Sequence, residues 1–251
     1  MGLINTLSAM LIVLNILAIG LLSVSASPGT EENEIADPFD ENYYESAEKV
    51  ERIADPLQSY NRAIFKFNDK LYFYLLKPLA KGYRAVLPEK ARISVRKMFT
   101  NLGMPVRFFN CVLQGKVKGS CCELTRFVVN TTWGIVGLFD PAKSCLHLKE
   151  QKEDFGQTLG FYGLKEGFFI TWPFLGPSSG RDTIGLAADY FSDPLVYYVD
   201  PLIKTGITVT DKVNGTSLRI GEYEDFKKSA LDPYVSMRNA YFQYRRNLIK
   251  K

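Results

Sequence analysis

The spacing of apolar residues is the feature that most constrains the fold of this chain. Between Leu57 and Leu76 the large apolar side chains recur at steps of three and four residues. This stripe consists of Tyr60, Ile64, Phe67, Leu71 and Leu75. Such a period is typical of an α-helix, and strict two-residue alternation over five or more residues is nearly absent. The pattern therefore predicts an all-α fold.

Prolines and Asp-Pro pairs indicate where the helices start and stop. Pro78 should end the first helix, because proline has no N–H to donate. Asp55-Pro56 and Asp232-Pro233 are typical helix starts, with the aspartate as N-cap. The other predicted helices cover residues 89–100, 105–114, 117–132, 181–191, 194–206 and 223–229, and the last runs from Asp232-Pro233 to about Ile249.

The N-terminal segment is typical of an exported protein. Residues 1–30 contain no charged side chain, and Leu7 to Val24 is a nearly continuous apolar run. Small residues around Ala26 suit signal peptidase. The run is also long enough to stay in a membrane. We therefore interpret residues 1–26 as a signal peptide or an N-terminal anchor.

Charge divides the rest of the chain into two parts. Residues 27–54 hold nine acidic and two basic residues and few aliphatic ones, which predicts a flexible acidic linker. Residues 55–251 hold 29 basic and 18 acidic residues, a net charge of +11, and should form one helical domain. A basic body favours an anionic partner, although a solubilising surface explains the charge equally well.

Two stretches carry no charge at all. They are Phe127–Phe139, over 13 residues, and Gly167–Gly180, over 14. Both are too short to cross a bilayer as a helix, which takes roughly 20 residues. Two interpretations remain open for them, buried core helices and interfacial or re-entrant segments.

The segment Gly176–Gly180 fits the G-x-S-x-G pattern of serine hydrolases around Ser178. That pattern marks a nucleophile only between a strand and a helix. Pro173 and Pro177 are poor residues for a strand, and the only histidine, His147, precedes the serine instead of following it. We therefore expect Ser178 or Ser179 to cap a helix, and we do not expect an enzyme.

Other chemistries lack the residues that they need. One histidine and four cysteines without a CxxC pair do not predict a metal site. The cysteines are either buried thiols or partners in disulfides of an exported protein. No glycine cluster has the spacing of a phosphate loop, so no cofactor is expected. No nucleic-acid-binding module is recognisable.

Short sequence blocks follow one another in a characteristic order over residues 55–246. They include Asp55–Arg62, Phe65–Asn68, Lys77–Arg84, Asn101–Gly103, Leu113–Gly115, Gly134–Asp140, Asp154–Gly160, Leu175–Ser178, Arg181–Asp182 and Asp232–Tyr234. Each block is weak alone, but their order and spacing resemble those of the MlaA/VacJ family of outer-membrane phospholipid-transport lipoproteins.

The resemblance implies a fold, a location and a function. The fold would be a ring-like bundle of amphipathic and interfacial helices with a central channel, lying in the inner leaflet of the outer membrane on its periplasmic side in a Gram-negative bacterium. The protein would remove misplaced phospholipids from the outer leaflet and pass them to a periplasmic lipid-carrier protein. Trimeric porins would be partners. The alternative is a scaffold that binds a porin without moving lipid.

The resemblance also supplies candidates for the lipid channel and its gate. These are Gly134, Gly137, Asp140, Asn61, Asn68, Arg181 and Asp182. The main hypothesis is that the loop Gly134–Asp140 controls lipid entry, and a plain structural turn is the alternative. The family is usually lipidated on a cysteine just after the signal, whereas the first cysteine here is Cys111.

Overall fold

The described part of the chain is built almost entirely of helices, as predicted. The computed structural model describes residues 55–250, so the predicted signal or anchor (1–26) and acidic linker (27–54) lie outside the described residues. The helices are α3 (Gln58–Leu71), the π-helical η1 (Tyr72–Leu76), α4 (Lys77–Val86), α5 (Glu89–Leu102), α6 (Met104–Leu113), α7 (Val117–Thr132), α8 (Pro141–Ser144), α9 (Phe155–Phe161), α10 (Gly180–Ser192), α11 (Leu195–Tyr198), α12 (Pro201–Leu218), α13 (Glu222–Ser229) and α14 (Pro233–Ile249).

The prediction that Pro78 ends the first helix is wrong. α3 passes through η1 directly into α4, and Pro78 lies in the first turn of α4. At this point the backbone N–H of Lys77 bonds to the carbonyl of Tyr72, five residues back. A helix with this wider turn no longer needs the hydrogen bond that proline cannot give, so the chain stays helical.

A β-hairpin interrupts the helical fold where the sequence argued against strands. Strand β1 (Phe169–Trp172) pairs antiparallel with β2 (Gly176–Ser179), with Phe169 opposite Ser179 and Trp172 opposite Gly176. In a two-stranded ribbon each strand has one edge that pairs with no other strand. Pro177 is tolerated in β2 because that free edge needs no N–H donor.

The two Asp-Pro pairs that were predicted to start helices have different roles. Asp232 caps α14 as predicted and accepts hydrogen bonds from the backbone N–H groups of Tyr234 (3.0 Å) and Val235 (3.3 Å). Asp55 does not cap α3, whose N-cap is Leu57. Its carboxylate instead accepts hydrogen bonds from Tyr234 and Arg238 of α14, so a contact between the first and last described helices replaces the cap.

Another Asp-Pro pair, Asp200-Pro201, divides the helix predicted over residues 194–206. The structure has α11 and then α12, which begins at Pro201 and extends to Leu218. Asp200 is the N-cap of α12 and accepts a hydrogen bond from the backbone N–H of Leu202 at 2.8 Å. The same capping chemistry that starts α14 therefore starts α12.

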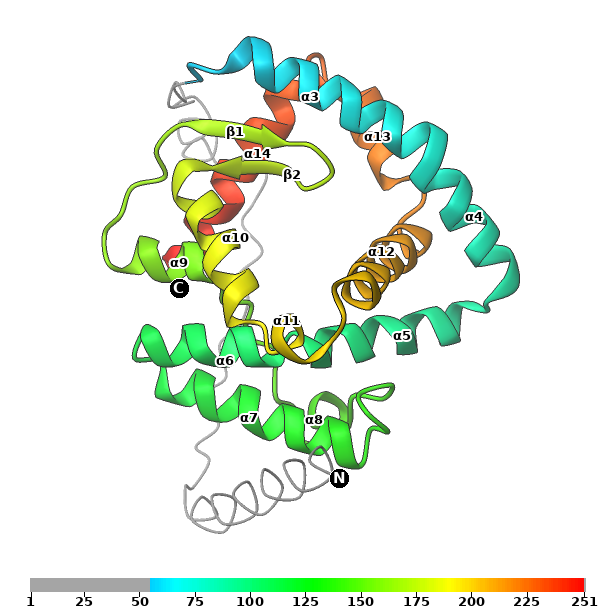
Figure 1. Ribbon diagram of the computed structural model, residues 1–251, viewed down its shortest axis with the longest axis vertical. Helices are drawn as coiled ribbons and strands as arrows, with labels where there is room; N and C mark the ends of the chain where they lie inside the picture. The colour runs from blue at the N-terminus through cyan, green and yellow to red at the C-terminus, as the bar shows by residue number, and fades with distance from the viewer. Residues whose placement is uncertain (1–54, 251) are drawn as a thin grey trace, which may run out of the picture. The chain divides into compact units, whose positions relative to one another are not determined.

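Packing joins elements that are far apart in the sequence. In Figure 1, α3 and α4 follow one long arc and α5 continues from it, while α12 lies along α4 and α5. α6 pairs with α7, and α9 pairs with α10. A small aromatic core of Phe169, Tyr234 and Phe242 joins the hairpin to α14.

Candidate functional site

Helix α3 buries a polar side chain and exposes apolar ones, although Phe65 packs on the core and Lys66 is also exposed. Asn61 is completely buried, whereas Tyr60 and Phe67, members of the predicted apolar stripe, are 42% and 44% exposed. In a water-soluble domain the apolar stripe of such a helix normally faces the core. Part of the outer surface of this helix is therefore apolar.

Asn61 and Asn68 hold the hairpin against α3. Asn61 donates to the carbonyl of Phe169 at 3.0 Å and accepts from the backbone N–H of Thr171 at 2.7 Å. Seven residues later, Asn68 binds the carbonyl of Trp172 at 3.0 Å and the N–H of Phe174 at 2.9 Å. The two amides satisfy backbone groups of β1 and its turn as a third strand would, so we assign these two candidates a structural role.

The same inversion extends through the described residues. Buried side chains are mainly polar or charged, and they include Arg92, Asn101, Asn110, Glu123, Asn130, Gln157, Asp182, Asn214 and Arg245. Large apolar side chains are exposed on several elements, among them Tyr74, Leu79, Val86, Val117, Trp133, Tyr198, Leu202 and Ile203. Exposed apolar surface on this scale is typical of a protein that contacts a membrane or a partner.

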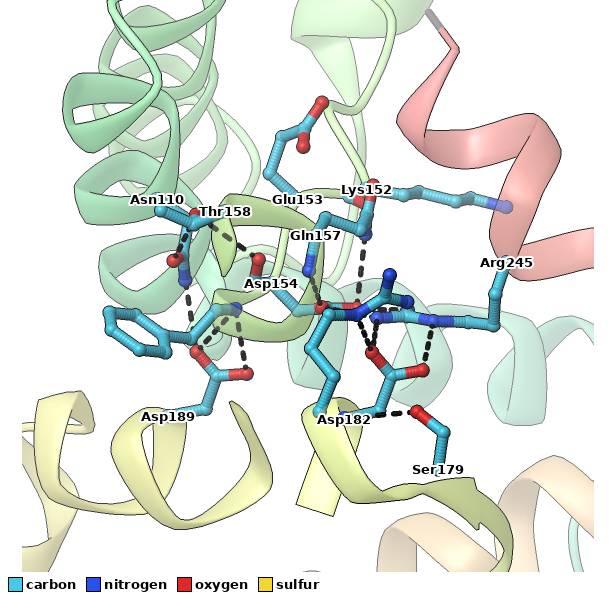
Figure 2. Close-up of polar contacts among 12 residues, drawn as sticks. Asn110, Lys152, Glu153, Asp154, Gln157, Thr158, Ser179, Asp182, Asp189 and Arg245 are labelled. Carbon is cyan, nitrogen blue, oxygen red and sulfur yellow. Dashed lines mark hydrogen bonds and ion pairs between the residues drawn. The ribbon is translucent and has the colours of Figure 1, made fainter. Parts of the chain in front are cut away.

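A buried ionic network joins α9, α10 and α14 (Figure 2). Arg245 of α14 donates to both carboxylate oxygens of Asp182, at 2.8 and 2.9 Å, and to both of Asp154, at 2.5 and 2.8 Å. Arg181 and Tyr241 add hydrogen bonds to Asp182 at 2.9 and 2.6 Å. The candidates Arg181 and Asp182 are therefore brought together in one buried cluster.

The network keeps its groups charged in spite of their burial. Burial alone would raise the pKa of Asp182, but the hydrogen bonds from Arg245 and Arg181 outweigh it and lower that pKa to about 2. Burial likewise opposes the charge of Arg245, and its bonds to Asp154 and Asp182 instead raise the pKa of Arg245 above its usual value. Breaking such a buried pair leaves an uncompensated charge and costs about 3–5 kcal/mol.

A second carboxylate continues the polar interior toward α6. Asp189 of α10 accepts hydrogen bonds from Asn110 at 2.9 Å and from the backbone N–H of Phe155 at 3.1 Å. Asn110 in turn accepts from the hydroxyl of Thr158 at 2.8 Å. Burial raises the pKa of Asp189 to about 6, because the hydrogen bonds from Asn110 and Phe155 only partly offset it. Figure 2 shows these groups beside the Arg245 cluster.

The loop Gly134–Asp140 is bonded tightly to the end of α7. The N–H of Gly137 donates to the carbonyl of Asn130 at 2.8 Å, and the N–H of Phe139 donates to the carbonyl of Gly134 at 2.9 Å. An added Cβ would lie 2.4 Å from the carbonyl oxygen of Asn130 at Gly134, and 2.6 Å from the Cβ of Asn101 at Gly137. Both glycines are therefore needed for close packing.

The tip of this loop exposes apolar side chains on a strained backbone. Ile135 and Val136 are 59% and 56% exposed and have φ angles of 53° and 57°. β-Branched residues rarely adopt this left-handed conformation. Such strain is found most often at functional sites.

Asp140 anchors the far end of the loop. It accepts hydrogen bonds from Arg126 at 2.9 Å and Asn130 at 3.0 Å, and it caps α8 through the N–H of Lys143. Burial alone would raise the pKa of Asp140, but these bonds outweigh it and lower the pKa. The loop thus leaves α7 and returns to it through one fixed carboxylate.

Ser178 and Ser179 are part of the framework. Ser179 is the N-cap of α10 and accepts a hydrogen bond from the backbone N–H of Asp182 at 3.1 Å. It is one of the two serines that were predicted to cap a helix. Ser178 is 2% exposed, and its hydroxyl lies 3.1 Å from that of Thr183. A strand does precede the helix here, contrary to our argument from the prolines, but His147 is exposed on a different segment.

Arg245, Asp154 and Asp189 were not among the predicted site residues, although Asp154 begins one of the family blocks. A signal was present in the last predicted helix, where Tyr241 and Arg245 are four residues apart and therefore share a face. A cation and a tyrosine on one face of a helix suit an interior carboxylate, but the carboxylates themselves come from distant segments.

The four cysteines are free thiols, with Cys111 buried and Cys145 exposed. Within residues 55–250 no cluster of histidine, cysteine and acidic side chains is arranged to hold a metal ion. None of the helices described is both long and apolar enough to cross a bilayer.

Comparison with known proteins gives consistent matches. The family model described as MlaA lipoprotein matches residues 53–248. The "Intermembrane phospholipid transport system lipoprotein MlaA" of Escherichia coli (strain K12) is 32% identical over 193 residues, which are 76% of either chain. The protein of the same name from Haemophilus influenzae is 31% identical over 195 residues, 75% of this chain and 76% of the relative.

An uncharacterized protein of Rickettsia conorii is 31% identical over 236 residues, 93% of this chain and 92% of that protein. A solved structure described as "Structural basis for maintenance of bacterial outer membrane lipid asymmetry" superposes with a TM-score of 0.69 and 30% identity. That match covers 78% of this chain and 99% of the other.

Proposed function

Because this chain belongs to the MlaA lipoprotein family, we propose that it moves misplaced phospholipids from the outer leaflet of the outer membrane toward the inner membrane. The lipid would be handed to a periplasmic carrier protein, and the chain would sit against a trimeric porin. Its place would be the inner leaflet of the outer membrane, on the periplasmic side.

The observation that carries this proposal is the inverted surface of the helical body. Apolar side chains such as Phe67, Leu75 and Leu79 are exposed, while Asn61 and Asp182 are buried in satisfied polar networks. Helices that lie in an interface bury their apolar faces among acyl chains. A ring of such helices has its apolar rim in lipid and leaves polar groups for a central channel, and we propose this arrangement for α3–α5, α10 and α12.

The energetics require a shielded path and no covalent chemistry. Exposing acyl chains to water costs about 0.8 kcal/mol per CH₂ group. A passage that covers the chains while the headgroup stays hydrated removes most of this cost. We therefore propose a transporter component that is not an enzyme.

The test is deletion of the gene followed by measurement of phospholipid in the outer leaflet. Deletion should raise that level, and the intact chain should restore it. Mass spectrometry of the purified protein should find bound phospholipid. A chain that binds a porin, carries no lipid and leaves the outer leaflet unchanged on deletion is a scaffold, and this result would overturn the proposal.

We propose further that the loop Gly134–Asp140 lies at the entry for lipid. Its exposed apolar tip carries this idea, because Ile135 and Val136 combine exposed apolar side chains with left-handed φ angles. Replacing both by asparagine should change outer-leaflet phospholipid while stability and membrane association stay near wild type. The matched control replaces the exposed neighbours Val112 and Leu113 of α6, which lies outside the proposed ring, and should leave outer-leaflet phospholipid unchanged. Unchanged lipid levels in the loop variant would leave the loop a structural turn.

A further inference from the structure

A basic cavity lies between α5, α7 and the segment that follows α8. Its volume is about 700 Å³, within the usual range of small-molecule sites. Seven lysine and arginine residues line it against two acidic residues, Asp140 and Glu150. In Figure 1, α7 and α8 lie on the side of α5 away from α12, and the residues that line the cavity include none of α10 or α12.

The arginines of this cavity are held in place by partners. Arg126 bonds to Asp140 at 2.9 Å and to the carbonyl of Leu148 at 2.5 Å. Arg107 bonds to Glu123 at 2.8 Å. Their guanidinium groups form fixed walls, and their charge is already largely compensated.

Four lysines contribute charge without compensation. Lys97 of α5, Lys143 of α8, Lys149 and Lys152 line the cavity, and none of them has an ion pair within residues 55–250. A lysine ammonium is a mobile point charge that suits phosphate oxygens. Several unpaired lysines around one cavity are typical of a site that binds an external anion.

The surroundings indicate which anion this is. The apolar loop that begins at Trp133, which is 75% exposed, runs between two wall residues, Asn130 and Asp140. Met104 and Phe127 add apolar lining inside the cavity. A phosphate with attached acyl chains needs this combination of cationic hollow and apolar rim, whereas a free phosphate needs only the charge.

We infer that this cavity binds the phosphate headgroup of a glycerophospholipid, with the acyl chains lying along the loop that follows α7. The inference rests on the proposed function and names a second lipid contact beside the channel. Basic clusters next to apolar surface bind anionic headgroups with a contribution from each lysine, so losing three lysines should weaken binding at least about tenfold.

The experiment measures binding of dihexanoyl phosphatidylglycerol and of inorganic phosphate to the full chain in detergent. The test variant is Lys97→Gln/Lys143→Gln/Lys149→Gln. The matched control, Lys165→Gln/Lys212→Gln/Lys228→Gln, removes the same charge from exposed lysines outside the cavity. The test variant should lose at least about tenfold in affinity for the lipid, and the control less than about twofold.

A second variant separates headgroup from acyl chain. Trp133→Ser should weaken binding of the lipid and leave the affinity for inorganic phosphate unchanged. Equal losses in the two lysine variants would overturn the inference, because net charge alone would then explain them. Inorganic phosphate binding as tightly as the lipid would also overturn it, since the site would then take a free anion.

The outcome for the cavity is distinguishable from that for the function. If the intact chain restores the outer leaflet in deleted cells while the lysine variant binds lipid normally, the cavity inference alone fails. If the intact chain neither restores the outer leaflet nor binds lipid, the proposed function fails.

Discussion

The two uncharged stretches of this chain differ in how deeply an aromatic side chain of each is buried. Gly167–Gly180 forms the hairpin, and its Phe169 is completely buried against Tyr234 and Phe242. Phe127–Phe139 ends in a loop whose Trp133 is 75% exposed. In length and lack of charge the stretches are nearly the same.

The difference lies in what each stretch finds nearby. The hairpin meets two amides of α3 that satisfy its backbone, and an aromatic face of α14 that buries Phe169, whereas Phe174 in its turn stays 67% exposed. The loop bonds to the end of its own helix and packs against the side chain of Asn101, so its backbone is satisfied while Trp133, Ile135 and Val136 stay exposed. Burial of an uncharged stretch therefore depends on partners from distant segments.

The largest expected effect tests this contrast directly. Phe169→Ala removes a side chain packed among aromatic rings and should lower the free energy of unfolding by about 3–5 kcal/mol. Trp133→Ala removes a larger ring from the exposed loop and should change it by less than about 0.5 kcal/mol. Chemical denaturation of both variants in detergent measures the difference. Similar losses would show that the loop is buried as deeply as the hairpin.

Acid should affect the hairpin side more than the loop side. The pKa of Asp182, beside the hairpin, is lowered to about 2 and that of Asp140, in the loop, is also lowered. A carboxyl whose folded-state pKa is depressed adds stability above its unfolded pKa of about 4, and this stability is lost as the pH falls through the folded value. Unfolding followed from pH 5 to pH 2 should therefore show a loss in the wild type.

Asparagine variants separate the two contributions. Asp182→Asn should lower the free energy of unfolding at neutral pH by about 3 kcal/mol, because Arg245 loses a buried partner. The variant should also lose less stability than the wild type between pH 5 and pH 2. Asp140→Asn should lower the free energy of unfolding by about 1 kcal/mol and should reduce its pH dependence less than Asp182→Asn does. An equal or larger effect at Asp140 would contradict the ranking.

The loop glycines should show an intermediate effect. Gly134→Ala and Gly137→Ala place a Cβ within 2.6 Å of neighbouring atoms, and Gly137 has a φ of +89°. Each should lower stability by about 1–3 kcal/mol. Gly206→Ala in α12 meets no heavy atom within 4 Å and should be neutral or stabilising by up to about 1 kcal/mol. Thermal unfolding would check this, and unaffected stability at Gly134 and Gly137 would mean that the loop is looser than its contacts indicate.

The smallest expected effect has the opposite sign. Val136→Asn places a residue that tolerates the left-handed conformation at a φ of 57°, and it should raise stability by about 1 kcal/mol or less. Val112→Asn, at a similarly exposed site in α6, provides the control and should not stabilise. A stabilisation of equal size in both variants would show that lost apolar exposure is the cause instead of relieved strain.

Many features of this protein follow from chemistry between residues that are close together in the sequence. Helix positions, the caps at Asp232 and Ser179 and the family blocks depend on residues within a few positions of one another. These features could be predicted because the spacing and capping signals lie within a single segment.

Tertiary structure decided the remaining features, which depend on residues far apart in the chain. Which face of α3 is inside depends on the hairpin, whose backbone groups lie more than a hundred residues away from Asn61. Asp55 bonds to Tyr234 of α14 instead of capping α3, and Arg245 bonds to Asp154 and Asp182, which belong to two other parts of the chain. Spacing along the sequence indicates which side chains share a face, but the chemistry of the surface that the face meets comes from distant residues.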